Sequence, residues 1–430
     1  MTAEIAVFNK SAVALAADSA VTISGGENQK IYNGAEKLFA LTKHHPVGVM
    51  VYGSGDLCSA PWELVIKAYR KYLGAKHFPR LEDYATDFFN FLQNSKAIVT
   101  PGMREGHLYH FLSEGVFELL ITSFANKKPD NYWNPLNHAL FFEELEEYGH
   151  ELLEFLSDTE FLNDFSGDDI DDATEFCREV TVRIVAEKLS SIPTNEIPQS
   201  FLNTVCTIFA TMICKSSDIG NITGIVFAGY GEDDYYPKVL SHDVCGFFKD
   251  KIRCSTHPEK CSANGESGVT PFAQSEEVGA FMQGVSYNIV DKFHSEYQGS
   301  IQNLLNGIDG VVTKMVPEDK IEEARNAIVD LVESTVSECD QRINSFVSEN
   351  YIRKVVDMIR FLPKQDLAYM AESLVNLTAF KRKVSEDSET VGGPIDVAVI
   401  SKADGFIWVK RKHYFTHDLN HHYFARTQPS

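Results

Sequence analysis

Short apolar runs separated by polar turns dominate the first 55 residues. The runs IAVF and AVALAAD are joined by NKS, and a second pair, EKLFAL and VGVMVYG, flanks TKHHP. Apolar runs of about four to eight residues bounded by turn residues are typical of buried strands. We therefore predict two hairpins that together form one four-stranded antiparallel sheet, with the intervening SGGENQK as a loop.

Helical periodicity follows this sheet. Apolar residues three and four positions apart predict helices in APWELVIKAYRKYL and LEDYATDFFNFLQ, and again through most of residues 96–218. Strand character returns at 222–245, where an apolar run ends in a Gly, Asp and Glu turn. A third helical block covers 274–381, with Ser275 as its candidate N-cap.

The C-terminal part, GGPIDVAVISKADGFIWVKRKHYF, predicts a closing hairpin with its turn at Lys402–Gly405. The order is therefore sheet, helices, strands, helices, hairpin, which favours an α+β fold. Such a chain can stack two antiparallel sheets with helices on both outer sides, a four-layer αββα sandwich with extra helical insertions. The predicted domains are a core of residues 2–95, 219–299 and 360–416, helical insertions at 96–218 and 300–359, and a tail at 417–430.

Composition and charge narrow the function classes. The 430 residues are 44% hydrophobic, enough to bury a large core, and their formal net charge is -22. This acidity disfavours binding to nucleic acid or anionic lipid, because such partners are also anionic. No apolar run reaches the roughly 18 residues of a membrane span, and the start lacks a signal-peptide pattern. We expect a soluble, cytoplasmic protein with no nucleic-acid or membrane partner.

The eight cysteines are too few and too irregularly spaced for a disulfide framework, so we expect reduced thiols. One cluster, Cys245, Cys254, His257 and Cys261, contains residue types that ligate zinc. It has no CxxC pair, and the interval from Cys245 to Cys254 matches no common zinc spacing. Loop thiols with a solvated histidine are therefore the favoured interpretation, and no metal or cofactor is expected.

The opening stretch TAEIAVFNKSAVALAADSAVT resembles the start of a mature proteasome β-type subunit or its bacterial relatives, which are N-terminal nucleophile (Ntn) hydrolases. The resemblance implies roles for five residues. They are Thr2 as nucleophile, Asp18 in AAD as the buried aspartate, Lys37 in EKLFAL as the lysine opening the third strand, Gly53 after VMVY as the oxyanion-hole glycine, and Ser275 as a helper of the N-terminal amine.

Two later matches to the family are partial. Residues 224–246 resemble its central hairpin, and Val391-Gly392-Gly393 resembles its Ser-Gly-Gly before the penultimate strand. Valine replaces the serine here, and Ser388 stands where the family usually has Asp, with Asp387 and Glu389 as neighbouring carboxylates. The supporting residues of the site therefore depart from the family pattern.

The family's chemistry explains why these residue types occur together. A threonine hydroxyl is a weak nucleophile that needs an adjacent base, and an N-terminal α-amine with a pKa of about 7.7 to 8.0 can take its proton. This requires removal of Met1, which a small second residue such as Thr2 permits. Lys37 would favour ionisation of the hydroxyl, Asp18 would hold Lys37, and the Gly53 N–H would stabilise the oxyanion.

The resemblance therefore implies a threonine-type Ntn hydrolase that cleaves amide bonds, with peptides or proteins as substrates. It also implies a homo-oligomer, with a regulatory or ATPase protein as a separate partner. Two alternatives stay open: a catalytically inactive structural or regulatory subunit, and a small-molecule amidase of the same fold. Each residue also has a plainer role: Thr2 as an ordinary second residue, Asp18 as a turn residue, Lys37 as a solvated residue at a strand start, Gly53 as a turn glycine and Ser275 as a simple N-cap.

Overall fold

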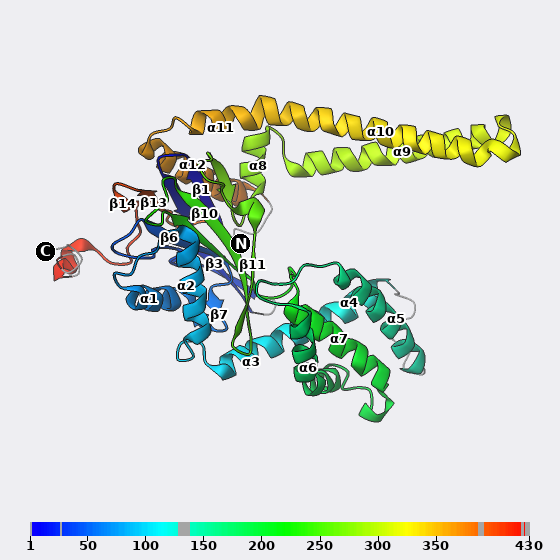
Figure 1. The fold of residues 1–430 in the computed structure, drawn as a ribbon, viewed down its shortest axis with the longest axis horizontal. Helices are drawn as coiled ribbons and strands as arrows, with labels where there is room; N and C mark the ends of the chain where they lie inside the picture. Colours follow the sequence, from blue (N-terminus) through cyan, green and yellow to red (C-terminus); the bar gives the residue numbers. More distant parts are fainter. Residues whose placement is uncertain (1, 26–27, 128–137, 386–390, 423–424, 426–430) are drawn as a thin grey trace. The chain divides into compact units, whose positions relative to one another are not determined.

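The computed structural model describes all residues except 1, 26–27, 128–137, 386–390, 423–424 and 426–430 (Figure 1). The chain is α+β, with antiparallel sheets and many helices. It divides into two compact units, each described separately below. Unit 1 comprises residues 1–34, 265–399 and 408–430, and unit 2 comprises 35–264 and 400–407.

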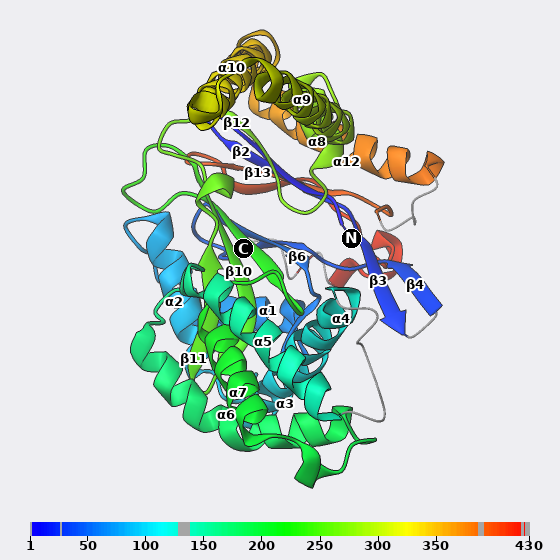
Figure 2. The same cartoon turned by 90° about the vertical axis from the view of Figure 1, so that its right-hand side faces the viewer.

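A five-stranded sheet in the order β12-β1-β2-β13-β14 forms the centre of unit 1. Its strands are β1 (Glu4–Phe8), β2 (Val13–Ala17), β12 (Gly268–Pro271), β13 (Asp396–Ser401) and β14 (Gly405–Lys410), the last two running into the 400–407 segment of unit 2. Strand β1 pairs antiparallel with β2 on one side and with β12 on the other. Because side chains alternate along a strand, Ala3, Ile5 and Val7 share one face, which packs on α12 (Lys364–Val384; Figure 2).

The remaining elements of unit 1 are mainly helical. They are the hairpin β3 (Ala20–Gly25) and β4 (Asn28–Asn33), followed by α8 (Glu276–Gln283), α9 (Tyr287–Met315), η4 (Glu318–Lys320), α10 (Ile321–Val347), η5 (Ser348–Ile352), α11 (Arg353–Ile359) and η6 (His417–Leu419). The core of this unit lies between the sheet, α8 and α12.

Unit 2 contains a second five-stranded sheet, in the order β11-β10-β9-β6-β5. Its strands are β5 (Leu38–Ala40), β6 (Val47–Gly53), β9 (Thr223–Gly229), β10 (Lys238–Phe248) and β11 (Lys251–Thr256), and a small ladder joins β7 (Asp56–Leu57) to β8 (Ala60–Pro61). Helices α1 (Trp62–Leu73) and α2 (Leu81–Asn94) pack their apolar stripes on one face of this sheet. The strands β9 and β10 confirm the predicted hairpin within 222–245.

A separate helical core accounts for the rest of unit 2. Its elements are α3 (Pro101–His110), η1 (Phe111–Phe117), α4 (Glu118–Lys127), α5 (His138–Ser157), α6 (Gly167–Lys188), η2 (Thr194–Glu196) and α7 (Gln199–Cys214), with η3 (Pro258–Lys260) following β11. The described part of residues 96–218 is thus helical, as its periodicity predicts. No helix among the described residues is long and apolar enough to cross a membrane.

The prediction of one four-stranded sheet from the first 55 residues is wrong. Strands β1 and β2 belong to the sheet of unit 1, whereas β5 and β6 belong to that of unit 2. The SGGENQK stretch is also no simple loop, because the backbone on both sides of residues 26–27 pairs as the β3–β4 hairpin. Each hairpin instead pairs with a strand from a distant part of the sequence, β12 or β9.

Candidate functional site

Thr2 immediately precedes β1, and its hydroxyl has a defined acceptor. Its Oγ1 donates a hydrogen bond to Oε2 of Glu4 over 2.8 Å. Residues two apart on a strand point to the same face, so Thr2 and Glu4 lie on the face opposite Ala3 and Ile5. Glu4 is fully buried and Thr2 is 7% exposed. The structure thus pairs the candidate nucleophile with a buried carboxylate.

Asp18 directly follows β2 and connects three separate backbone segments. Its Oδ1 accepts from the N–H of Ala3 at 3.2 Å, and its Oδ2 accepts from the N–H groups of Ala20 at 3.3 Å and Gly392 at 2.9 Å. The Asp18 N–H in turn donates to the carbonyl of Ala3. Asp18 is fully buried, so these bonds satisfy a carboxylate that water does not reach. Thr2 and Asp18 are therefore held together within unit 1.

Lys37 and Gly53 lie in unit 2, at the ends of two neighbouring strands of its sheet. Lys37 directly precedes β5, is buried, and accepts a hydrogen bond at its carbonyl from the N–H of Val51. Gly53 is the last residue of β6, two positions beyond Val51. The structure therefore brings these two residues to the same part of one sheet, as their positions around the third and fourth predicted strands suggest.

The backbone at Gly53 leaves no room for a side chain. Its φ is +82°, and a Cβ there would lie 2.4 Å from the carbonyl oxygen of Ile222. A buried network fixes the same turn, because the Trp62 Nε1–H donates to Oγ1 of Thr223, whose hydroxyl donates to the carbonyl of Ser54. Glycine at position 53 is thus required by the local structure, whatever its N–H contributes to chemistry.

Ser275 is the N-cap residue of α8 in unit 1, as predicted. Its side chain is exposed and makes no capping hydrogen bond, while its carbonyl accepts from the Gly279 N–H. Three residues earlier, the Phe272 N–H donates to the carbonyl of Glu4, which ties the segment before α8 to β1. Ser275 is therefore in the same unit as Thr2 and Asp18.

Glu4 is the residue that the sequence analysis missed. The near-continuous apolar run around it predicts burial, and strand alternation alone would have placed Glu4 on the side of Thr2. A carboxylate two residues after a candidate nucleophile on a buried strand is the signal that points to it. Met1, Asp387, Ser388 and Glu389 lie outside the described residues.

The cluster considered above as a zinc site consists of Cys245, Cys254, His257 and Cys261. In the structure its thiols are shielded from water to different degrees, and its histidine pairs with carboxylates. Burial raises the pKa of Cys254 to about 12 and also raises the pKa of the Cys245 and Cys261 thiols. The ring of His257 lies between two carboxylates, with Nε2 2.5 Å from Asp243 and Nδ1 2.8 Å from Glu259. In the part of the chain that the structure describes, no group of three or more His, Cys, Asp or Glu side chains is arranged to hold a metal ion.

Comparison with known proteins adds no relative. No protein-family model matches the chain, and a search of curated proteins finds no significant match.

Proposed function

We propose that the protein is a threonine-type Ntn hydrolase of amide bonds, with Thr2 as its nucleophile. The observation that carries the proposal is the assembly at the start of β1. There the Thr2 hydroxyl donates to the buried carboxylate of Glu4, and the adjacent Ala3 N–H donates to Asp18. This arrangement holds the hydroxyl oxygen in one position beside a proton acceptor.

In this mechanism cleavage of the Met1–Thr2 bond exposes the α-amine of Thr2. The Thr2 oxygen attacks the carbonyl carbon of the amide, and its proton passes to a base at the chain start. The α-amine is the base that the resemblance to the proteasome class implies, and Glu4 is a second acceptor already in contact. The amine product leaves with that proton, and water hydrolyses the resulting ester on Thr2.

Lys37 and Gly53 enter the proposal through the family resemblance. Burial of Lys37 supports including the lysine, whereas Gly53 is included on the resemblance alone, because the local backbone requires glycine there in any case. The lysine would favour the ionised hydroxyl, and the glycine N–H would stabilise the oxyanion of the tetrahedral intermediate.

The second candidate function is a non-catalytic structural or regulatory subunit. The observation that favours it is the long hairpin of α9 and α10, whose helices expose many large apolar side chains. Under this alternative the Thr2–Glu4 bond only stabilises the start of β1. A small-molecule amidase shares the proposed chemistry and differs only in its substrate.

Amide hydrolysis by Thr2 variants tests the proposal. A panel of fluorogenic peptides and small amides should be cleaved by the wild type and by Thr2→Ser, which retains a hydroxyl and a free amine. Thr2→Ala should lower turnover by at least about a thousandfold, the scale expected for loss of a nucleophile. Lys37→Ala should be nearly as damaging.

Thr270→Ala is the matched control, because Thr270 lies on β12, which pairs with β1, and has no role in the proposal. Its turnover should equal that of the wild type. Hydrolysis that persists in Thr2→Ala, or a wild type that cleaves no member of the panel, would contradict the proposed function.

A further inference from the structure

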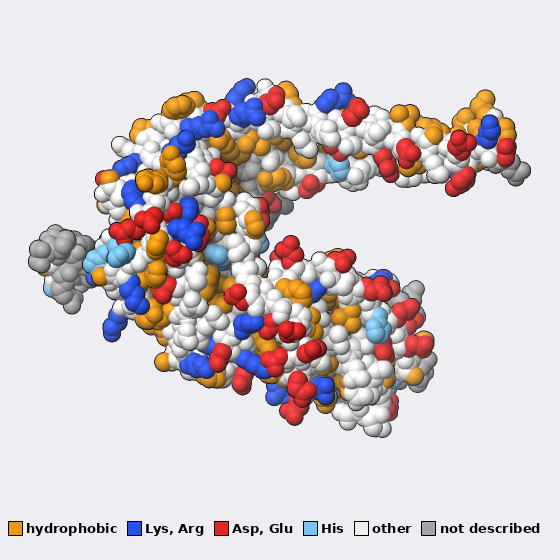
Figure 3. Space-filling view, in the orientation of Figure 1, with side chains coloured by type: hydrophobic (Ala, Val, Ile, Leu, Met, Phe, Trp, Pro, Cys, Tyr) orange, Lys and Arg blue, Asp and Glu red, His pale blue; other side chains and the backbone are white. Residues whose placement is uncertain are grey.

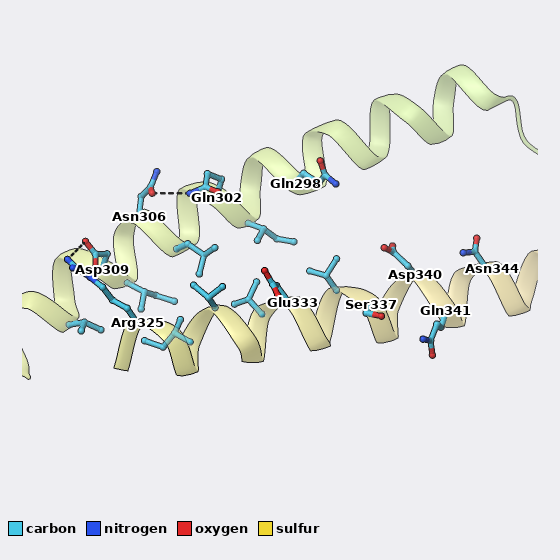
Figure 4. Close-up of a pocket in the computed structure, with 18 residues that line it drawn as sticks. Gln298, Gln302, Asn306, Asp309, Arg325, Glu333, Ser337, Asp340, Gln341 and Asn344 are labelled. Atoms are coloured by element: carbon cyan, nitrogen blue, oxygen red, sulfur yellow. Dashed lines mark hydrogen bonds and ion pairs between the residues drawn. The ribbon is translucent and has the colours of Figure 1, made fainter. Parts of the chain in front are cut away.

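The helices α9 and α10 run antiparallel as a hairpin with an apolar seam (Figure 4). Between them is a groove of about 850 Å³. The apolar side chains of its floor are Ile301, Leu305, Ile308 and Val312 on α9, and Ile328, Val329, Val332 and Val336 on α10; those at 301, 305, 308 and 312 and at 329, 332 and 336 recur every three or four residues. This spacing is typical of helices that pack in a coiled coil.

The seam is left open along most of its length. Among the described residues of the two helices, Val312 is the only one that is buried. An ion pair closes one end of the groove, with Asp309 Oδ1 2.5 Å from Arg325 Nε and Asp309 Oδ2 3.2 Å from Nη2. In Figure 4 the helices diverge from this pair toward Gln298 and Asn344. Two helices therefore present an apolar floor that a third helix would bury.

Acidic and amide side chains form the rim of the groove. Glu333 and Asp340 line it from α10, and within the described residues neither makes an ion pair. The one Lys or Arg of the lining is Arg325, which already pairs with Asp309. Across residues 287–347 the sequence has eleven Asp and Glu against five Lys and Arg, and Figure 3 shows acidic side chains toward the hairpin tip. The rim therefore favours a cationic occupant.

We propose that this groove binds a cationic amphipathic helix of a partner protein. The partner's aliphatic residues at coiled-coil spacing would pack on the seam, and Lys or Arg on its flanks would pair with Glu333 and Asp340. A second copy of the hairpin is disfavoured because it would bring the same acidic excess against this rim. The proposal does not depend on the proposed hydrolase activity.

The test uses the full chain and three synthetic helical peptides labelled with fluorescein. The first has Leu and Ile at the coiled-coil core positions and Lys on the flanks. The second has Glu in place of each Lys, and the third has Ser in place of the core residues. Fluorescence anisotropy at about 0.15 M salt, where the screening length is about 8 Å, measures binding of each peptide.

Two pairs of variants locate the binding. Glu333→Lys changes the charge of the rim, and Glu338→Lys makes the same change on an exposed residue of α10 that does not line the groove. Val332→Ser removes part of the floor, and Leu331→Ser alters a more exposed neighbour outside it. All four positions are at least partly exposed, so we expect the hairpin to remain folded in each variant, which circular dichroism checks.

The Lys peptide should bind at least tenfold more tightly than the Glu and Ser peptides. Glu333→Lys and Val332→Ser should each weaken it at least tenfold, while Glu338→Lys and Leu331→Ser should change its Kd less than twofold. Equal effects of both members of a pair would show only non-specific attraction to an acidic protein and would overturn the proposal. So would failure of the Lys peptide to bind, or a chain that self-associates through the groove and excludes it.

Discussion

At the start of β1 the hydroxyl of Thr2 and the carboxylate of Glu4 form a buried pair whose role can be separated from folding. In Glu4→Gln the side chain keeps its size and an acceptor oxygen but loses its charge and basicity. We therefore expect amide hydrolysis to fall at least tenfold, with little change in the thermal unfolding temperature.

Glu277→Gln is the control for Glu4, since Glu277 is also a buried carboxylate of unit 1 and pairs with Lys381 at 3.0 Å. This change should lower stability and leave the turnover number unchanged. A Glu4→Gln protein with wild-type turnover would show that Glu4 serves the fold alone.

Loss of the Asp18 carboxylate should lower the stability of the fold, whether or not the protein is an enzyme. Asp18→Ala leaves the N–H groups of Ala3, Ala20 and Gly392 without their acceptor, and a buried unsatisfied donor costs about 1 to 3 kcal/mol. The free energy of unfolding should fall by about 3 kcal/mol or more, as measured by urea denaturation. Asp319→Ala, at an exposed position in the same unit, should change it by less than about 0.5 kcal/mol. An Asp18→Ala protein as stable as this control would contradict the described bonds.

On strand β10 burial lowers the pKa of His242 to about 4; Asp243 opposes this shift and His257 adds to it. The ring lies edge-on to Phe89 and Phe227, and its Nδ1 is 3.1 Å from the Thr256 hydroxyl. In the unfolded chain the His242 ring takes up a proton near pH 6.5, whereas in the folded protein the ring stays neutral until about pH 4. The contribution of the neutral His242 ring to the free energy of unfolding is therefore complete above about pH 6.5 and is lost as the pH falls to about 4.

His242→Phe should remove this part of the pH dependence. Between pH 6.5 and pH 4 the wild type should lose on the order of 3 kcal/mol more unfolding free energy than the variant, as measured by denaturation at each pH. His150→Gln, at an exposed histidine, should retain the wild-type slope. Parallel curves for the wild type and His242→Phe would contradict a half-buried, neutral ring.

Local patterns predict individual elements of this chain well. The hairpins β9–β10 and β13–β14 each join strands that are consecutive in the sequence, so the apolar runs and the polar residues between them reveal both hairpins. The strand β12 was missed because its four half-buried residues give no apolar run, and its pairing with β1 spans more than 250 residues. Pairing over such distances is set by tertiary packing, which a local pattern does not contain.

In the whole molecule, the sequence likewise predicts the local position of each candidate site residue but not which distant segments come together. The sequence places Thr2, Asp18, Lys37 and Gly53 at strand ends, and the structure agrees for each. It does not indicate that Thr2 and Asp18 belong to one compact unit while Lys37 and Gly53 belong to the other. That division follows from the choice of distant partner strands, and homo-oligomer formation likewise stays a prediction for light scattering to test.

Whether Thr2 is the nucleophile can be tested by the mass of the N-terminal peptide after treatment with a peptide vinyl sulfone, an electrophile that traps nucleophilic threonine. An active preparation of the full chain is treated, digested and analysed by mass spectrometry. We expect a peptide that begins at Thr2 and carries one adduct on that residue. An active preparation in which Met1 remains attached throughout, or in which Thr2 is never modified while the inhibitor abolishes hydrolysis, would contradict this expectation.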